Sequence, residues 1–342
     1  MVDIQKLIRP NVRNLKPYSS ARDEFKGSAS VWLDANENPN NNGLNRYPDP
    51  LQKKLKARIS ELKNVPAENI FLGNGSDEAI DLLFRGFCEP GKDKALICSP
   101  TYGMYQVSAD INDVEVIDVP LTPDWQLNIE STEKNFAEPD LKLIFICSPN
   151  NPTGNSIRRE DIIHVLSKFN GLVVIDEAYI DFAEQESFSN ELQKHNNIVV
   201  LQTLSKAWGL AGIRLGMAFA NEEVIEVLNR IKPPYNVNQL TQEVALKELA
   251  DEAGFENEVK AILTERTRLT KELSQLTNVL HIYPSDANFL LVKFIQPKAV
   301  YDALTEKEIV VRDRSKVAEG CLRITVGTET ENSQLINELK KL

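Results

Sequence analysis

One lysine of this sequence lies among apolar and glycine residues, where a charged side chain is poorly solvated. The segment TLSKAWGLAGIRLG (203–216) places Lys206 between Leu204 and the run AWGLA (207–211). Removal from water disfavours the ammonium form, lowers the pKa of a lysine and leaves an amine that can act as a nucleophile. One use of such an amine is a Schiff base with an aldehyde cofactor. For an isolated lysine, a snorkelling side chain or a buried ion pair would be the simpler interpretation. The residues in the other motifs therefore determine whether Lys206 is a cofactor-binding residue.

Side chains suited to such a cofactor stand at the ends of other apolar runs. They are Asp176 and Tyr179 in VVIDEAY, Tyr102 in CSPTYG and Asn151 in CSPNNPTG. Pyridoxal phosphate needs an amine, a carboxylate at its ring nitrogen, a donor at its phenolate oxygen and a cradle for its phosphate. Asp176 would keep the ring nitrogen protonated, and Tyr179 and Asn151 would donate to the phenolate. Tyr102 would stack on the ring face.

The phosphate of such a cofactor would bind where a helix begins. The segment GNGSDEAIDLLF places Gly73, Gly75 and Ser76 at a predicted helix N-terminus, followed by Asp77. Free backbone N–H groups and the helix dipole favour an anion there. Taken alone, this segment is also typical of a well-capped helix. Ser205 and Arg214 flank the lysine and would complete the cradle.

The middle of the chain alternates short apolar runs with helical patterns such as RREDIIHVLSKF (158–169). Because the runs are continuously apolar, they predict strands buried on both faces, as in a mostly parallel sheet covered by helices. The predicted strands are KALIC (94–98), VEVIDV (114–119), LKLIFIC (141–147), GLVVID (171–176), NIVVLQT (197–203) and LGMAFA (215–220). Ligand-binding residues of such sheets gather beyond the carboxyl ends of the strands, where the motifs above lie.

A proline pair in IKPPYNVNQ (231–239) stops a helix that begins at Asn221. Beyond it we expect two long helices, three strands and a final helix, for which Thr328 and Glu331 have capping-box spacing. The strands are ANFLLVKF (287–294), IVVRD (309–313) and CLRITVG (321–327). The turn NPNNNG (38–43) ends an N-terminal arm. We therefore predict an arm (1–43), a large domain (44–234) and a small C-terminal α/β domain (235–342).

The composition narrows the classes of partner. A net charge of −11 over 342 residues, with 42% hydrophobic and 26% charged residues, is typical of a soluble globular protein. That charge argues against nucleic acid or an anionic membrane as the partner. A local arginine cluster can still reverse the field inside a pocket and favour a small anion. No segment approaches the ~20 apolar residues needed to span a bilayer, and the first residues lack a signal-peptide core.

Cysteine and histidine spacing argues against disulfides and metals. The cysteines form no CxxC pair, and the histidines have no metal-ligand spacing. They are Cys88, Cys98, Cys147 and Cys321, and His164, His195 and His281. We expect buried structural thiols, no metal site and a reducing, cytoplasmic compartment.

The motifs SPNNPTG, DEAY and TLSKAWGLAGIRLG, in this order, resemble those of the fold type I pyridoxal-phosphate aminotransferases. Further segments make nearly the whole chain similar to the histidinol-phosphate aminotransferase family. They are NVRNLKPYSSAR (11–22), WLDANENP (32–39), NRYPDP (45–50), FCEPGKD (87–93), PTYGMY (100–105) and CLRITVG (321–327). The resemblance implies an α/β fold in which a large domain has a mostly parallel, seven-stranded type of sheet flanked by helices, with a smaller C-terminal α/β domain.

The resemblance also implies an activity and a cofactor. The reaction is pyridoxal-5'-phosphate-dependent transfer of an amino group from L-histidinol phosphate to 2-oxoglutarate, giving imidazole acetol phosphate and L-glutamate in histidine biosynthesis. Lys206 is then the Schiff-base residue. The other cofactor contacts are Asp176, Tyr179, Asn151 and Tyr102 at the ring, and Gly75, Ser76, Asp77, Ser205 and Arg214 at the phosphate. Tyr47 in NRYP matches a residue that reaches the cofactor phosphate of the partner subunit, which implies a homodimer with shared active sites.

Substrate contacts also follow from the resemblance. Arg323 in CLRITVG matches the arginine that holds the substrate carboxylate in ordinary aminotransferases, and Arg312 lies on a neighbouring predicted strand. Two arginines so placed could clamp a phosphate dianion, although Arg312 could instead form a surface pair with Asp313. Further residues resemble substrate contacts, and the tyrosines among them could equally be packing residues. They are Tyr18, Tyr235 and Asn36.

Two other interpretations use the same motifs. An aromatic-amino-acid aminotransferase or an amino-acid-phosphate decarboxylase would share the scaffold and cofactor. A non-catalytic pyridoxal-phosphate sensor fused to a DNA-binding module would require an added helix-turn-helix domain, which the sequence lacks.

Overall fold

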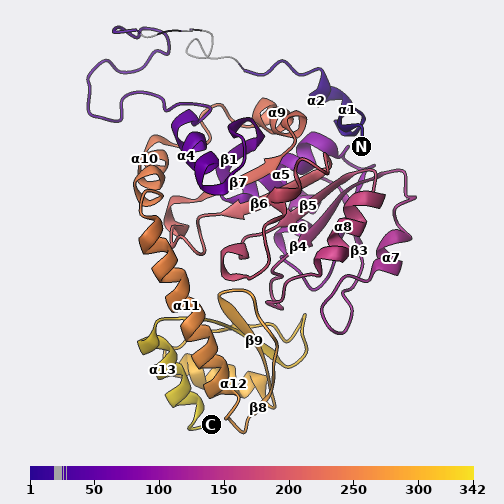
Figure 1. The fold of residues 1–342 in the computed structure, drawn as a ribbon, viewed down its shortest axis with the longest axis vertical. Helices are drawn as coiled ribbons and strands as arrows, with labels where there is room; N and C mark the ends of the chain where they lie inside the picture. The colour runs from indigo at the N-terminus through magenta and orange to yellow at the C-terminus, as the bar shows by residue number, and fades with distance from the viewer. Residues whose placement is uncertain (19–24, 26, 28) are drawn as a thin grey trace.

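Two β-sheets organise the residues described by this computed structural model, which are 1–18, 25, 27 and 29–342 (Figure 1). The larger sheet has seven strands in the order β1-β7-β6-β5-β4-β2-β3. Their bounds are β1 Ile70–Asn74, β2 Lys94–Ile97, β3 Glu115–Asp118, β4 Leu141–Cys147, β5 Leu172–Asp176, β6 Ile198–Thr203 and β7 Leu215–Ala220. Only β7 runs against its neighbours. The carboxyl ends of the other six strands therefore meet at one edge of the sheet.

Helices cover both faces of the larger sheet. One face packs against α1 (Ile4–Leu7), α2 (Pro10–Arg13), α5 (Ser76–Phe87), α6 (Met104–Ile111) and α9 (Glu222–Ile231). The other packs against α4 (Lys53–Lys63), α7 (Ile129–Glu133), α8 (Arg159–Lys168) and α10 (Gln239–Glu248). Alternate residues of each central strand enter the two cores, as Phe145 and Ile144 do in β4. The predicted burial of both faces is confirmed.

The predicted elements of the middle of the chain are present with small shifts at their ends. All six predicted strands form, the helical pattern at 158–169 is α8, and α9 follows its cap Asn221 and ends before the proline pair. The prediction omitted β1, because its apolar part is only the run IFL before GNG. It also omitted β8 (Val279–Ile282), which is an exposed edge strand.

The smaller sheet has the order β10-β11-β9-β8 and lies below the larger one in Figure 1. Its remaining strands are β9 (Phe289–Phe294), β10 (Arg312–Asp313) and β11 (Cys321–Thr325), and it packs against α11 (Glu252–Leu273), α12 (Pro297–Glu306) and α13 (Glu329–Leu339). The capping box predicted for α13 is confirmed. Helix α11 runs from the side of the larger sheet to the smaller one, so it connects the two cores. The proposed domain boundaries stay a prediction.

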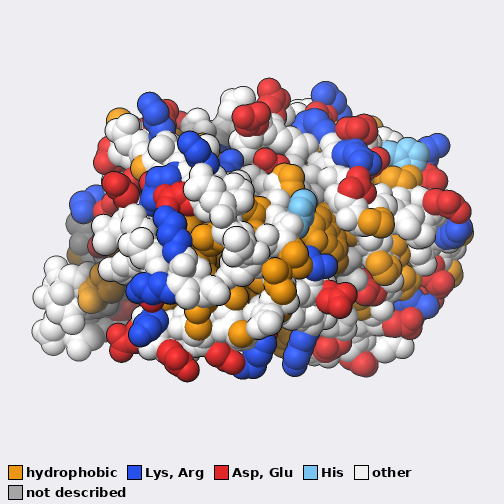
Figure 2. All heavy atoms as spheres, turned by 90° about the horizontal axis from the view of Figure 1, so that it is seen from below, with side chains coloured by type: hydrophobic (Ala, Val, Ile, Leu, Met, Phe, Trp, Pro, Cys, Tyr) orange, Lys and Arg blue, Asp and Glu red, His pale blue; other side chains and the backbone are white. Residues whose placement is uncertain are grey.

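The surface agrees with a mixed charge pattern. Acidic and basic side chains are interspersed over the face seen in Figure 2. The four cysteines are buried and free, as expected. Within the described residues, no helix is both long enough and apolar enough to span a membrane.

A backbone contact joins β7 to the turn that starts α5. Gly216 in β7 lies opposite Gly73 in β1. A Cβ atom added at Gly216 would lie 2.2 Å from the carbonyl carbon of Gly75 and 2.2 Å from the nitrogen of Ser76. Gly75 N–H also donates to the carbonyl of Arg214 at 2.8 Å. The first turn of α5 is therefore held against the residues that precede β7.

We predict that Gly216→Ala lowers the free energy of unfolding by about 1–3 kcal/mol, because overpacking against backbone has no flexible side chain to absorb it. Gly212→Ala is the matched control, since a Cβ there meets nothing within 4 Å, and Ala in place of Gly reduces the entropy of the unfolded chain. Urea denaturation of both variants measures the difference. Equal stability of the two variants would show that the turn simply moves aside.

Candidate active site

A cavity of about 390 Å³ opens at the carboxyl edge of the larger sheet, beside β10 and β11. We call it the strand-end cavity. Twelve of the sequence-predicted site residues line it, together with Cys147, Ala178, Thr203 and Arg314. The twelve are Gly75, Ser76, Asp77, Tyr102, Asn151, Asp176, Tyr179, Ser205, Lys206, Arg214, Arg312 and Arg323. Segments separated by more than 240 positions in sequence thus form one site, of the size typical of ligand pockets.

Asp176 is the last residue of β5 and is only 2% exposed. Its Oδ2 accepts a hydrogen bond from the Tyr105 hydroxyl at 2.7 Å, and its Oδ1 accepts one from the Ala178 N–H at 3.0 Å. Burial raises the pKa of the Asp176 carboxyl, and these hydrogen bonds oppose that shift. A cation beside this carboxylate would be strongly stabilised, because little water competes for the charge.

Tyr105 is a site residue that the sequence analysis did not assign. It is fully buried in α6, and its ring meets that of Tyr102 edge to face with centroids 5.6 Å apart. The signal available was a second tyrosine three positions after Tyr102 in PTYGMY, at the start of a helix. The sequence alone does not pair Tyr105 with Asp176, because Asp176 lies 71 positions further along the chain, at the end of β5.

Lys206 is half-buried in the cavity after β6. Burial lowers the pKa of its ammonium, the positive charges of Arg323 and Arg214 lower it further, and Asp176 and Asp77 oppose the shift. Its Nζ lies 5.5 Å from the centroid of the Tyr179 ring. The setting therefore increases the fraction of free amine, as the sequence analysis expected.

A short chain of hydrogen bonds orients Tyr179. Arg323 Nη1 donates to Asn151 Oδ1 at 2.5 Å, and Asn151 Nδ2 donates to the Tyr179 hydroxyl oxygen at 3.3 Å. Burial raises the pKa of Tyr179, so it keeps its proton. Because its oxygen already accepts from Asn151, the hydroxyl proton can be donated to a ligand in the cavity.

The opposite end of the cavity is suited to an anion. Helix α5 begins at Ser76 without a side-chain cap, and Gly75 before it has φ +74°. A Cβ atom at Gly75 would lie 2.8 Å from Arg214 Nη2, so the absence of a side chain lets the guanidinium approach the helix start. Arg214 Nη1 also lies 3.5 Å from Ser205 Oγ. Backbone N–H groups, a guanidinium and a hydroxyl thus converge.

Asp77 contacts other side chains of the cavity wall. Its Oδ1 accepts a hydrogen bond from the Tyr102 hydroxyl at 3.0 Å, and its Oδ2 lies 3.7 Å from Arg214 Nη2. The carboxylate therefore ties Tyr102 and Arg214 together. Its predicted direct contact with the cofactor stays a prediction.

Arginines form the third side of the cavity. Arg312 in β10 lies opposite Arg323 in β11, so the two predicted arginines share a face of the sheet. Asp313, the alternative partner of Arg312, points to the other face because successive strand residues alternate. Arg314 joins them and was not assigned from the sequence. The available signal was the spacing of two in VVRDRS.

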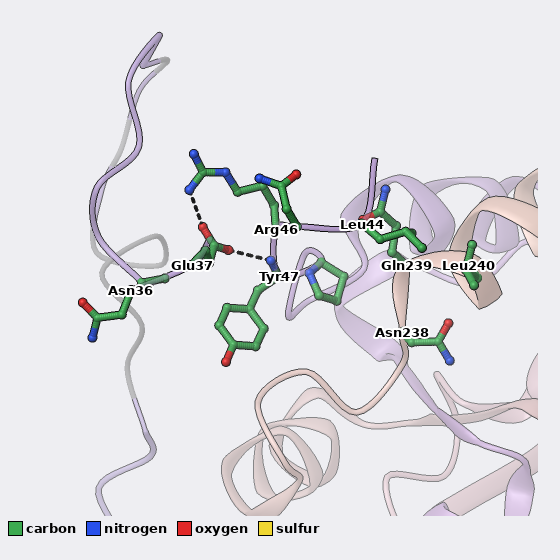
Figure 3. A pocket seen from close by; sticks show the side chains of 11 residues that line it. Asn36, Glu37, Leu44, Arg46, Tyr47, Asn238, Gln239 and Leu240 are labelled. Atoms are coloured by element: carbon green, nitrogen blue, oxygen red, sulfur yellow. Dashed lines mark hydrogen bonds and ion pairs between the residues drawn. The ribbon is translucent and has the colours of Figure 1, made fainter. Parts of the chain in front are cut away.

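The remaining predicted residues lie outside the strand-end cavity. Tyr47 and Asn36 line a second cavity of about 470 Å³, which we call the arm cavity, with Asn238, Gln239 and Leu240 (Figure 3). The ring of Tyr47 stacks on that of Tyr235, which lies nearby, with centroids 4.4 Å apart. Tyr18 lies in the arm and is 72% exposed. Within one subunit, the structure does not bring these four residues to Lys206.

Glu37 holds the wall of the arm cavity together. Its carboxylate accepts hydrogen bonds from Arg46 Nη1 at 2.7 Å and from the Tyr47 N–H at 2.6 Å, as the dashed lines in Figure 3 mark. The segments WLDANENP and NRYPDP are thus joined by a buried acid. The phenol of Tyr47 remains half-exposed at the edge of the cavity.

Comparison with known proteins places these features in a family. The family model "Aminotransferase class I and II" matches residues 19–339. A histidinol-phosphate aminotransferase of Parabacteroides distasonis is 58% identical over 344 aligned positions, which cover 100% of this chain and 99% of the relative. The solved histidinol-phosphate aminotransferase of Clostridium acetobutylicum has a TM-score of 0.80 at 27% identity, over 87% of this chain and 90% of that one.

A further solved structure bears on the fold. The histidinol-phosphate aminotransferase of Sinorhizobium meliloti, in complex with pyridoxal-5'-phosphate, has a TM-score of 0.79 at 22% identity, over 86% of this chain and 82% of that one. The predicted fold type I architecture is confirmed by these likenesses. The family match also takes in every residue that lines the strand-end cavity. The chain therefore belongs to the aminotransferase class I and II family.

Proposed function

We propose that this protein transfers the amino group of L-histidinol phosphate to 2-oxoglutarate, using pyridoxal 5'-phosphate and serving histidine biosynthesis. The observation that carries the proposal is the strand-end cavity, which is lined by a lysine with a lowered pKa, a buried carboxylate and four arginines. Curated relatives that are named histidinol-phosphate aminotransferase match 98–100% of the chain. An aromatic-amino-acid aminotransferase or an amino-acid-phosphate decarboxylase is not favoured, because curated relatives that are 53–58% identical are named histidinol-phosphate aminotransferase.

The residues of the cavity fit the cofactor. The uncapped start of α5, with Gly75 open to Arg214, suits a phosphate group. Asp176 has a carboxylate that is shielded from water and suited to a cationic ring nitrogen. Lys206 would hold the aldehyde carbon, and Tyr179 would donate to the phenolate oxygen. When bound, the cofactor supplies an electron sink that stabilises negative charge on the substrate carbon.

The chain itself supplies proton transfer and substrate binding. Lys206 Nζ would take the proton from the substrate carbon that carries the amino group, because burial lowers the pKa of its ammonium and so favours the free amine that can act as a base. Arg312 and Arg323 bind the substrate phosphate from one face of the small sheet. Arg323 also binds a carboxylate of 2-oxoglutarate, since its hydrogen bond to Asn151 directs it towards Tyr179.

We also propose a cytoplasmic homodimer with shared active sites. Large apolar side chains are exposed along the arm and beside the arm cavity, and a partner subunit would cover them. They are Val31, Leu33, Leu44, Tyr47 and Leu240. Tyr47 would then reach the cofactor phosphate of the partner. Sedimentation analysis should give about twice the mass of one chain, and Leu33→Asp combined with Leu44→Asp should shift the protein towards a monomer. A wild-type monomer at micromolar concentration would contradict the proposal.

We predict that borohydride treatment of the protein incubated with pyridoxal phosphate attaches the cofactor to the peptide that contains Lys206. This lysine has a lowered pKa and lies in the cavity with Asp176. Lys206→Ala should lose turnover by several orders of magnitude. Peptide mass spectrometry identifies the site, and Lys316, an exposed lysine outside the cavity, is the control that should remain unlabelled. Labelling at another lysine would remove the basis of the assignment.

We predict that Arg312→Ala lowers kcat/KM for L-histidinol phosphate by roughly ten- to more than a hundredfold, the equivalent of losing about 1.5–3 kcal/mol from a charge-assisted contact. L-histidinol, which lacks the phosphate, should be almost unaffected. Arg323→Ala should weaken both histidinol phosphate and 2-oxoglutarate, because we assign it to both. Steady-state kinetics with each substrate varied separately makes the measurement. Equal losses for the two donors in Arg312→Ala would mean that this arginine supports structure.

A further inference from the structure

We infer that Arg314 is a third guanidinium that binds the phosphate of the amino donor and makes the site selective for phosphorylated amines. This inference rests on the proposed function and extends it to a residue that lies two positions beyond Arg312. Alternate residues of a strand face the same side, so Arg314 and Arg312 project together. Arg323, directly opposite Arg312, completes the group. All three line the strand-end cavity.

The backbone of Arg314 is held by the strand pair. Its N–H donates to the carbonyl of Cys321 at 3.0 Å, which continues the pairing of β10 with β11 beyond Asp313. The carbonyl of Arg314 accepts hydrogen bonds from the N–H groups of Val317 and Ala318. The side chain therefore leaves a fixed point of the sheet edge, which favours a defined direction into the cavity.

The side chain of Arg314 has an unused donor. Its Nε is buried and has no hydrogen-bond partner among the described residues. A buried donor without an acceptor carries a desolvation penalty, which a ligand oxygen would remove. Burial lowers the pKa of Arg314, and the positive charges of Arg323 and Arg312 lower it further. These groups repel one another until an anion enters.

The charges that line the cavity are unequal. Five cationic side chains line it, namely Lys206, Arg214, Arg312, Arg314 and Arg323, against the two acids Asp77 and Asp176. Asp77 is engaged by Tyr102 and Arg214, and Asp176 by Tyr105. The arginine end thus has an excess of positive charge. A phosphate dianion, with three terminal oxygens, can accept from three guanidinium groups, whereas a carboxylate has two oxygens.

The test uses the cofactor-loaded enzyme and compares Arg314→Gln with Lys316→Gln. The control removes one positive charge from an exposed side chain on the same turn, outside the cavity. Arg314→Gln should lower kcat/KM for L-histidinol phosphate by roughly ten- to a hundredfold, mainly through KM, and leave L-histidinol within about twofold. Arg314→Lys keeps the charge but loses the planar fork, so its loss should be intermediate. Lys316→Gln should behave as wild type.

Calorimetric titration of the same loaded proteins with inorganic phosphate separates this inference from the proposed function. Arg314→Gln should bind phosphate several-fold more weakly than Lys316→Gln does. If the wild type fails to turn over histidinol phosphate, the proposed function is wrong, and the phosphate titration still decides the role of Arg314. Equal phosphate affinity in the two variants, or equal losses with histidinol and histidinol phosphate, would overturn the inference. If Arg314→Gln does not fold, wild-type selectivity in Arg314→Lys would overturn it as well.

Discussion

Asp176 lies at the end of a central strand, where an ionised carboxylate is stable only if fixed donors and a cation compensate for the water it has lost. The Tyr105 hydroxyl and the Ala178 N–H supply the donors. Lys206 follows the neighbouring strand and lies close enough for its charge to lower the pKa of Asp176. The position of Asp176 in turn depends on β5, whose pairing with β4 places Asp176 beside Cys147. The geometry of the cavity thus follows from the register of its strands.

The two ends of the cavity gain their positive charge by different means. At one end, a helix start and Arg214 converge through close contacts, which depend on Gly75 and on Gly216 of β7. At the other, side chains of an antiparallel strand pair provide the positive charge. An acidic protein can therefore present two positively charged ends in one pocket, because short distances and low water content outweigh the more distant negative charges.

Local sequence patterns were sufficient for much of this site. Apolar runs predicted nine of the eleven strands that the described residues form, and residues such as Asp176 and Lys206 could be placed at strand ends because parallel strands share an edge. Tyr105 and Arg314 were not assigned, since their partners are distant in sequence and only the fold brings them together. For the arm residues, the resemblance assigned a role that the structure of one chain does not reproduce. Family likeness named Tyr18 and Tyr47, but one chain does not complete the site they were expected to join.

Cys147 has a consequence for the chemical selectivity of the cavity. Its Sγ donates to the Pro149 carbonyl at 3.4 Å, and burial together with the charge of Asp176 raises the pKa of the thiol. A thiolate is a strong nucleophile towards aldehydes, whereas a protonated thiol is a weak one. Burial therefore acts on both groups: it lowers the pKa of Lys206, and it keeps the Cys147 thiol protonated and weakly nucleophilic. An incoming carbonyl compound would meet a nucleophilic nitrogen and a protonated thiol, so a competing hemithioacetal adduct is suppressed by burial and by the charge of Asp176.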